Sequence, residues 1–293
     1  MVNPAAWHGD AGSRLDAHLK HAASLGPGSI SFSAQNPAEA AAGLERAGPD
    51  VIPVAVGGDG TVALLVQALR ARGERERAFG VLPFGTGNAF AHAIGVGRVE
   101  DAFDTLASGE VRALDLMATD HPRMPVALVS ISVGFESRLL ESMANNRRVS
   151  PVIGAARGAL TSVGRRWRGV ELMLDGEIVS DPSEPIHNVG LYNHRCYAKG
   201  KVVYPNADPT DGRGEAVVYR KTGPYLRALA KGIHTQTRRD TPGVSVRRWS
   251  TARFRSSLPF QADGESLAPG DMQIRLEKRA LRVLVPRKEL ARS

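Results

Sequence analysis

The run Gly57-Gly58-Asp59-Gly60-Thr61 constrains this chain most, because it separates two apolar segments of different periodicity. Residues 51–56 before it are apolar and rich in β-branched side chains, as in a buried parallel strand. Residues 62–70 after it have the apolar spacing of a helix, for which Thr61 is the candidate N-cap. The glycines permit a tight turn, and the helix N-terminus directs free N–H groups to one small volume. Such a volume suits a phosphate group.

Asp59, at the centre of this turn, is unexpected in a site that holds only an anion, because a carboxylate repels phosphate. A carboxylate is useful there if a divalent cation or a catalytic proton network is also present. The alternative is an ordinary connection between a strand and a helix, in which the glycines only serve the turn.

A second loop of the same design follows, Leu82-Pro-Phe-Gly-Thr-Gly-Asn-Ala-Phe-Ala91. A strand is expected at 78–82 before its turn, and a short helix at 89–94 after it. The carboxyl ends of neighbouring parallel strands meet at one edge of a sheet, so we expect the two turns to lie together and hold one nucleotide. Thr86 and Asn88 would hydrogen-bond to it, unless this turn too is only a connection.

Composition narrows the class of protein. The chain has 293 residues, of which 42% are hydrophobic, and this is sufficient for a proper core. Its single cysteine, Cys196, excludes a disulfide within the chain and suits a reducing compartment. No run approaches the roughly 18 apolar residues of a membrane-spanning helix, and no signal peptide is visible at the start. The formal net charge of +8 favours anionic partners, namely nucleic acid, acidic membrane or nucleotide.

The pattern of elements predicts two domains. Up to about residue 110, strands alternate with helices, including helices at 37–47 and 99–107, which indicates a parallel sheet covered on both faces. Beyond that, strands separated by Asp-Gly and Pro-Gly turns predominate, with helices at 157–166 and 224–234. We therefore expect an α/β nucleotide-binding domain at 1–110 and a largely antiparallel β domain at 111–293, whether or not the last residues pack back on the first domain. The expected strands of the second domain are 111–117, 126–133, 170–174, 186–192, 214–219, 244–246, 253–256, 272–276 and 281–285.

The two loops together resemble the diacylglycerol kinase catalytic-domain superfamily, which includes bacterial soluble lipid kinases and sphingosine kinases. Further motifs follow the order of that superfamily over nearly the whole chain. They are Asn3-Pro4, Arg112-Ala-Leu-Asp-Leu116, Ser130-Ile-Ser-Val-Gly-Phe135, Tyr204-Pro-Asn-Ala-Asp-Pro-Thr-Asp-Gly212 and Ala262-Asp-Gly-Glu265. The resemblance implies an α/β domain like that of NAD kinases plus a β-sandwich, with the active site in the cleft between them.

The resemblance also implies an ATP- and Mg²⁺-dependent transferase that phosphorylates a lipid hydroxyl in phospholipid metabolism. Asp59 would join the Mg²⁺–water network at the phosphates, and Glu265 or Asp263 would be the catalytic base. Asp208, Asp211 and the carbonyl of Arg213 would hold a structural Mg²⁺. Without the resemblance, Asp208 and Asp211 are as compatible with an Asx turn as with a metal site. Asp263 and Glu265 alone would favour a hairpin turn with solvated carboxylates. The implied ATP-binding residues are Asn3, Pro4, Ser33, Gly57, Gly58, Asp59, Gly60, Thr61, Gly85, Thr86, Gly87 and Asn88.

Departures from the superfamily pattern leave alternatives open. Val62-Ala63-Leu64 replaces the usual polar pair after the first loop, and Ala89 replaces an aspartate that bacterial diacylglycerol kinases carry. Sphingosine-kinase-like sequences also tend to have alanine there, so the acceptor is either diacylglycerol or a sphingoid-base-like lipid. One alternative is an NAD kinase, although that family lacks the second loop. The other is a catalytically weakened protein that binds nucleotide or lipid.

Basic clusters beside tryptophan, at 165–168 and 247–249, are typical of proteins that dock on an anionic bilayer. Residues 152–168, apolar and then basic, predict an interfacial helix, against the alternative of a solvated basic surface. We expect a cytoplasmic protein with peripheral membrane association and a lipid substrate. No nucleic-acid partner is expected, and a homodimer is left open.

Overall fold

The computed structural model describes residues 1, 33–146, 151–197, 202–203, 207–231 and 241–287. The predicted nucleotide residues Asn3 and Pro4 lie outside them. The chain divides into two compact units. Unit 1 comprises Met1–Asp115 with Arg279–Ser293, and unit 2 comprises Leu116–Tyr197 with Lys201–Lys278. Each is described by itself.

Unit 1 is built on the parallel strands β1 (Val54–Gly57) and β2 (Gly80–Pro83), which pair from Val54 opposite Gly80 to Gly57 opposite Pro83. Both strands therefore end at the same edge, where the two glycine-rich loops begin. On the other side of β1, the backbone of Met1 hydrogen-bonds to Val54 and Val56 (2.8 Å each). The helices of this unit are α2 (Pro37–Ala47), α3 (Asp59–Ala71), α4 (Ala89–Ala93) and α5 (Val99–Ser108).

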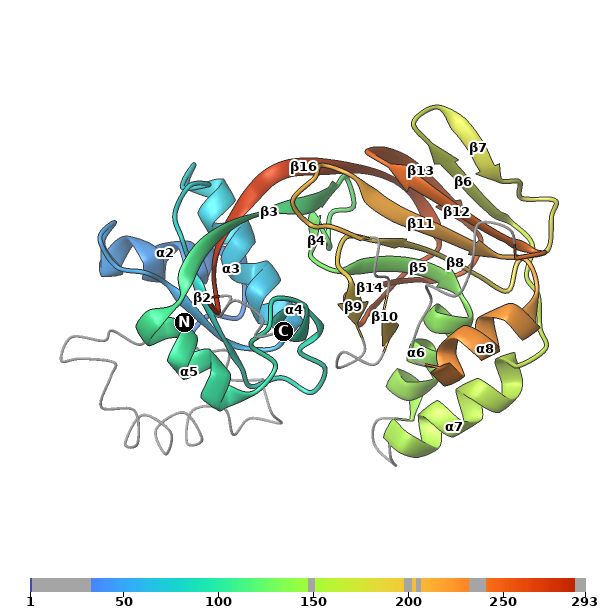
Figure 1. Ribbon diagram of the computed structural model, residues 1–293, viewed down its shortest axis with the longest axis horizontal. Coiled ribbons are helices and arrows are strands. Elements are labelled where there is room, and N and C mark those ends of the chain that lie inside the picture. The colour runs from blue at the N-terminus through green and yellow to red at the C-terminus, as the bar shows by residue number, and fades with distance from the viewer. Residues whose placement is uncertain (2–32, 147–150, 198–201, 204–206, 232–240, 288–293) are drawn as a thin grey trace, which may run out of the picture. The chain divides into compact units, whose positions relative to one another are not determined.

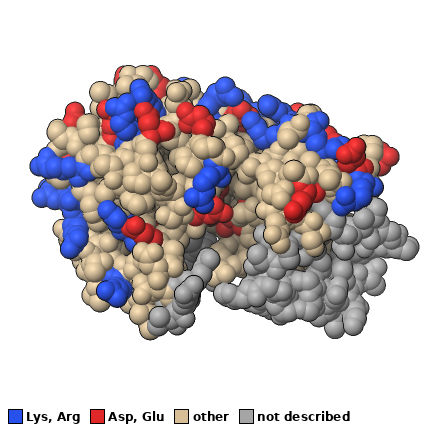
Figure 2. All heavy atoms as spheres, turned by 180° about the vertical axis from the view of Figure 1, so that it is seen from behind, with Lys and Arg blue, Asp and Glu red and all other residues tan. Residues whose placement is uncertain are grey.

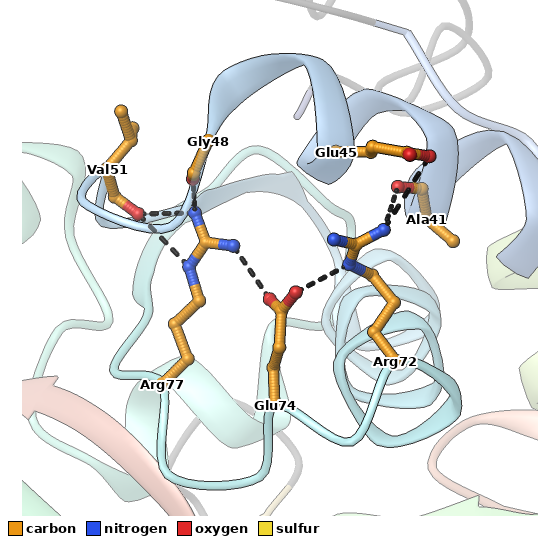
Figure 3. Close-up of polar contacts among 7 residues, drawn as sticks. All are labelled: Ala41, Glu45, Gly48, Val51, Arg72, Glu74 and Arg77. Atoms are coloured by element: carbon orange, nitrogen blue, oxygen red, sulfur yellow. Dashed lines mark hydrogen bonds and ion pairs between the residues drawn. The ribbon is translucent and has the colours of Figure 1, made fainter.

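Local signals set the ends of α2. Asn36 caps its N-terminus by accepting a hydrogen bond from the N–H of Glu39 (3.0 Å), and proline occupies the first turn. Just after the C-terminal end of α2, the carbonyls of Gly48 and Val51 accept hydrogen bonds from Arg77. The carboxylate of Glu74 forms ion pairs with both Arg77 and Arg72 (Figure 3). Burial alone would raise the pKa of Glu74, but hydrogen bonds from the two arginines lower it overall. This clasp joins α2 to the turn after α3.

Unit 2 is built on two six-stranded sheets whose facing residues form one core (Figure 1), and the first residues of β3 and the last residues of β16 belong to unit 1. One sheet has the order β4-β3-β16-β13-β6-β7 and the other β12-β11-β8-β5-β14-β15. Both sheets supply the buried apolar side chains between them, including Leu172 and Phe254 from the first and Leu191 and Phe260 from the second. The described strands of the sheets are β3 (Glu110–Thr119), β4 (Val126–Ala127), β5 (Ser130–Gly134), β6 (Val170–Leu174), β7 (Glu177–Ser180), β8 (Asn188–Tyr192), β11 (Gly214–Tyr219), β12 (Val244–Trp249), β13 (Thr251–Ser256), β14 (Phe260–Ala262), β15 (Glu265–Leu267) and β16 (Gly270–Val285).

Helices α6 (Phe135–Asn145), α7 (Pro151–Ser162) and α8 (Thr222–Lys231) belong to the same unit, as does the small hairpin of β9 (Cys196–Tyr197) and β10 (Val202–Val203). A second, aromatic core cluster includes Phe135, Tyr192, Tyr219 and Tyr225. None of the helices in the described ranges combines the length and hydropathy that crossing a bilayer requires.

Several element boundaries differ from expectation, and three of the differences are described here. The strand expected at 126–133 is broken into β4 and β5, because the N–H groups of Leu128 and Val129 donate to the carboxylate of Asp263 and not to a neighbouring strand. The two strands expected at 272–276 and 281–285 form one strand, β16. The helix expected at 157–166 is α7, which ends at Ser162 before Gly164 at φ +80°.

Candidate nucleotide and phosphoryl-transfer residues

The two glycine-rich loops of unit 1 touch through their backbones. A methyl group added at Gly85 would collide with Cα of Gly58 and lie 2.8 Å from its nitrogen. At Gly57, a methyl group would lie 2.8 Å from Cβ of Thr61. Glycine is therefore required by close approach at both loops, which is a stronger constraint than turn geometry alone.

Asp59 links the first loop to the helix that follows the second. Its two carboxylate oxygens accept hydrogen bonds from the N–H groups of Ala89 (2.9 Å) and Phe90 (2.8 Å), at the start of α4. Burial raises the pKa of Asp59, and these two amide bonds oppose that shift. Asp59 thus satisfies N-terminal amides of α4, a role that its place in the sequence does not reveal.

Asn88 fixes the second loop from within. Its side-chain oxygen accepts from the N–H of Gly85 (2.8 Å), and its side-chain nitrogen donates to the carbonyls of Pro83 (3.0 Å) and Gly85 (2.8 Å). Its backbone is left-handed, at φ +52°. Asparagine tolerates this conformation better than most residues, so the side chain shapes the loop. Its contact with a nucleotide stays a prediction.

The remaining predicted nucleotide residues of unit 1 differ in exposure. Thr86 and Gly87 are exposed at the tip of the second loop, Gly60 is exposed in the first turn of α3, and Ser33 is exposed as well. Thr61 is buried at 2% exposure and is not the N-cap, because α3 begins at Asp59 with Gly58 as its cap. The structure thus brings the two loops together and leaves backbone and the Thr86 side chain at their tips.

In unit 2, the β14–β15 hairpin separates the two candidate bases. The carboxylate of Asp263 accepts hydrogen bonds from the N–H groups of Leu128, Val129 (2.9 Å) and Ser130 (3.0 Å). Asp263 occupies the turn at φ +46°, and its own N–H donates to Ser130. Glu265 is exposed, and its carboxylate forms no hydrogen bond or ion pair with any described residue. Of the two, Glu265 has the side chain that is available to a substrate.

The predicted metal residues share one turn, but their carboxylates already have partners. Asp208 accepts hydrogen bonds from the N–H (3.0 Å) and the hydroxyl (2.7 Å) of Thr210. The bond from the hydroxyl is the main reason that the pKa of Asp208 is lowered. One oxygen of Asp211 accepts the N–H of Arg213 (2.8 Å), and the other pairs with the guanidinium of Arg248. Within the described ranges, no group of three or more His, Cys, Asp or Glu residues could hold a metal ion. Arg248 already pairs with Asp211, so a divalent cation would have to compete with it, and the assignment of this turn to Mg²⁺ stays a prediction.

Sequence reasoning missed a buried carboxylate in unit 2. Glu136 is 8% exposed, and the hydroxyls of Tyr192 (3.3 Å) and Tyr225 (3.2 Å) donate to it. Burial and the neighbouring Glu136 raise the pKa of Tyr225. The side chain of Asn188 accepts the N–H of Glu136 (3.1 Å). These partners come from α6, β8 and α8, and no local pattern in the sequence brings them together.

Comparison with known proteins finds a family whose model includes both glycine-rich loops. Residues 1–119 match the family model of the diacylglycerol kinase catalytic domain. The resemblance to the diacylglycerol kinase superfamily is confirmed. The match covers both loops of unit 1.

Relatives and solved structures extend the similarity into unit 2. The chain is 26% identical over 243 residues to a protein named "Probable lipid kinase YegS-like" from Pseudomonas aeruginosa, covering 80% of this chain and 76% of the relative. It is 26% identical over 246 residues to "Lipid kinase YegS" of Escherichia coli K12, covering 80% and 77%. A solved diacylglycerol kinase from Bacillus anthracis has a TM-score of 0.64 at 18% identity, covering 98% of this chain and 95% of that chain. The predicted fold class, an α/β domain with an antiparallel β domain, is confirmed.

Proposed function

We propose that the chain is an ATP-dependent lipid kinase that transfers a phosphoryl group to the hydroxyl of a diacylglycerol-like or sphingoid-base-like lipid. The observation that carries the proposal is the contact between Gly58 and Gly85 at the shared edge of β1 and β2. Superfamily relatives named as lipid kinases support the choice of acceptor class.

The loops of unit 1 would bind the triphosphate of ATP. Phosphoryl transfer depends mainly on positioning and on stabilising the negative charge of the phosphates. Backbone N–H groups at a helix N-terminus supply part of that stabilisation, and ATP would bring Mg²⁺ as its own counterion. Asp59 would act here by holding α4 against the first loop. Its carboxylate oxygens keep lone pairs with which to accept from a metal-bound water.

Glu265 would accept the proton of the lipid hydroxyl. A base must have an oxygen free to receive a proton, and three backbone amides occupy the carboxylate of Asp263. Asp263 would instead hold the β14–β15 hairpin, so that Glu265 is presented from a fixed strand.

An acceptor screen tests this function. The purified chain is incubated with radiolabelled ATP and Mg²⁺, and diacylglycerol, sphingoid base and NAD are offered separately, with the Asp59→Ala variant as the inactive control. Label in a lipid, lost in the variant, is the expected result.

Two other outcomes would contradict the proposal. Label in NAD alone would mean an NAD kinase. Nucleotide binding without transfer to any acceptor would indicate a binding protein, for which the apolar Val62-Ala63-Leu64 is the sequence argument.

A further inference from the structure

Helix α7 carries its small residues inward and its large apolar residues outward. Gly154, Gly158 and Ser162 are buried on one face, against α6. A methyl group at Gly154 would lie 2.8 Å from Cα of Met143, and one at Gly158 would lie 2.8 Å from Cβ of Ser142. The reverse arrangement is typical of a helix that packs on a globular core.

The outward face is apolar. Ile153 is 53% exposed, Leu160 is 81% exposed, and Val163, just beyond the helix, is 48% exposed. Their spacing of seven and three residues places them on one side of a helix. Ile153, Leu160 and Val163 are hereafter called the α7 face. Three neighbouring side chains of this kind mark an interaction surface, whereas single exposed apolar residues do not.

The charges around the α7 face are unbalanced. The helix and the turn after it carry Arg157, Arg165, Arg166 and Arg168, and residues 151–170 include no acidic side chain. Within the described ranges, none of these four guanidinium groups has an ion-pair partner.

Several arginines on the sheets of unit 2 have acidic partners. Arg220 pairs with Glu184 (3.0 Å), and Arg253 pairs with Asp271 (2.6 Å). Figure 2 likewise shows basic groups beside acidic ones at many places on the visible surface. The exposed apolar side chains of α7 are therefore accompanied by four guanidinium groups that have no acidic partner among the described residues.

A polar hollow of about 620 Å³ lies beside this face, between α6 and α7. Arg138, Arg157 and Arg165 line it, together with one acidic residue, Glu141, and with Trp167. Only Arg138 among the three arginines has an acidic partner, Glu141 at 2.7 Å. The volume falls within the range of small-ligand sites, and an excess of guanidinium groups suits a phosphate.

We propose that the α7 face docks on an anionic phospholipid bilayer, and that the hollow between α6 and α7 receives the phosphate of one headgroup. Leu160, Ile153 and Val163 would enter the interface between headgroups and acyl chains, where apolar side chains are stabilised. The four arginines would lie at the level of the headgroups, which carry the complementary charge. The inference goes beyond the proposed function, because a bilayer would be bound whether or not phosphate is transferred.

Co-sedimentation with vesicles tests the docking without ATP. The whole chain is mixed with vesicles of phosphatidylcholine alone or of phosphatidylcholine with phosphatidylglycerol, and the bound fraction is measured at low and high salt. We expect binding to the anionic vesicles, weakened by salt. Leu160→Asp should weaken it at least about tenfold, since an apolar side chain would no longer be buried. Ile178→Asp, at a 60% exposed position on β7, is the matched control and should bind as the unaltered chain does.

Two arginine variants test the hollow. Replacing Arg157 and Arg165 by glutamine together should weaken binding by about 25-fold, on the basis of about fivefold per basic residue near a charged bilayer. Arg253→Gln removes an exposed guanidinium that is paired with Asp271, and it should have little effect. Circular dichroism melts would show whether each variant folds.

Several results would overturn the inference. They are absence of binding to anionic vesicles, equal binding to phosphatidylcholine alone, and unchanged binding of folded Leu160→Asp. A folded Leu160→Asp variant that converts a dimer to a monomer without affecting vesicle binding would assign the face to a second copy of the chain. Each of these results would leave the kinase proposal standing, because no assay here depends on turnover.

Discussion

The carboxylate of Asp59 is committed to two backbone amides of α4, so the first residue-scale prediction concerns that link. Asp59→Asn keeps the size of the side chain but places an NH₂ group against one of the two N–H donors. We expect turnover to fall about 10²-fold or more, because the second loop is no longer held in register with the first. Asp104→Asn changes an exposed acid of the same unit and should leave turnover unchanged. Steady-state kinetics with thermal melts checks both, and normal turnover of folded Asp59→Asn would refute this role.

Asp263 and Glu265 are two residues apart, and the structure predicts opposite phenotypes for them. Glu265→Gln removes an exposed carboxylate, so kcat should fall by about 10²-fold or more while the melting temperature stays constant. Asp263→Asn weakens three backbone hydrogen bonds, so the free energy of unfolding should fall by about 1–3 kcal/mol. Urea denaturation and initial rates separate the two effects. The reverse pattern would make Asp263 the base.

At the scale of elements, local sequence signals predict the chain well where backbone chemistry decides the structure. Asn36 and Pro37 define the start of α2, and alternating segments define most strands of unit 2. Local sequence signals fail where the side chain of a residue distant in the sequence binds the backbone. The strand expected at 126–133 is interrupted because Asp263 binds amides more than 130 positions away. Continuity of β16 depends on Arg279, at φ +53°, whose N–H donates to Asp115 (2.8 Å).

The contact between the two loops predicts the effect of one methyl group. Gly85→Ala would force Gly58 and the side chain of Asn88 apart, since the methyl would lie 2.6 Å from Oδ1 of Asn88. We expect ATP affinity to fall at least about tenfold, because the amides at the loop tips would no longer converge. Gly270→Ala adds a methyl group in open space and is the control. Equilibrium binding of a fluorescent ATP analogue measures the change, and unaltered affinity would rule out a shared phosphate site.

The hairpin turn between β6 and β7 predicts a pH dependence of stability. Asp175 accepts hydrogen bonds from the backbone N–H groups and hydroxyls of Ser250 and Thr251, and it pairs with Arg213 (3.0 Å). Burial opposes ionisation here, but these bonds lower the pKa of Asp175 overall. The stabilisation is therefore complete above the unfolded-state pKa, about 3.9, and is lost as pH falls through the lower folded-state value. Urea denaturation from pH 6 to pH 3 should show a smaller acid loss in Asp175→Asn than in the unaltered chain. An identical pH profile would contradict the assignment.

For the molecule as a whole, motifs in the sequence predicted which residues gather at the loops but not what their side chains do. The glycines lie where predicted because their spacing follows from the strand and turn. By contrast, Asn88 bonds within its own loop, Thr61 is buried, and Arg248 neutralises Asp211. These roles depend on neighbours that only the fold supplies. Motif spacing therefore identifies a candidate site better than it assigns the chemistry of each member.

The division into two units makes a prediction about ligand-induced stability. Every described residue of the predicted nucleotide set lies in unit 1, and both candidate bases lie in unit 2. A ligand that binds only the folded state stabilises it by about 2.7 kcal/mol at a concentration of 100 Kd. MgATP should therefore raise the melting temperature of the unaltered chain and of Glu265→Gln equally, and that of Gly85→Ala by about half as much or less. Differential scanning fluorimetry over a range of MgATP concentrations measures the three shifts. A shift preserved in Gly85→Ala but lost in Glu265→Gln would locate nucleotide binding in unit 2 and remove the basis of the proposed function.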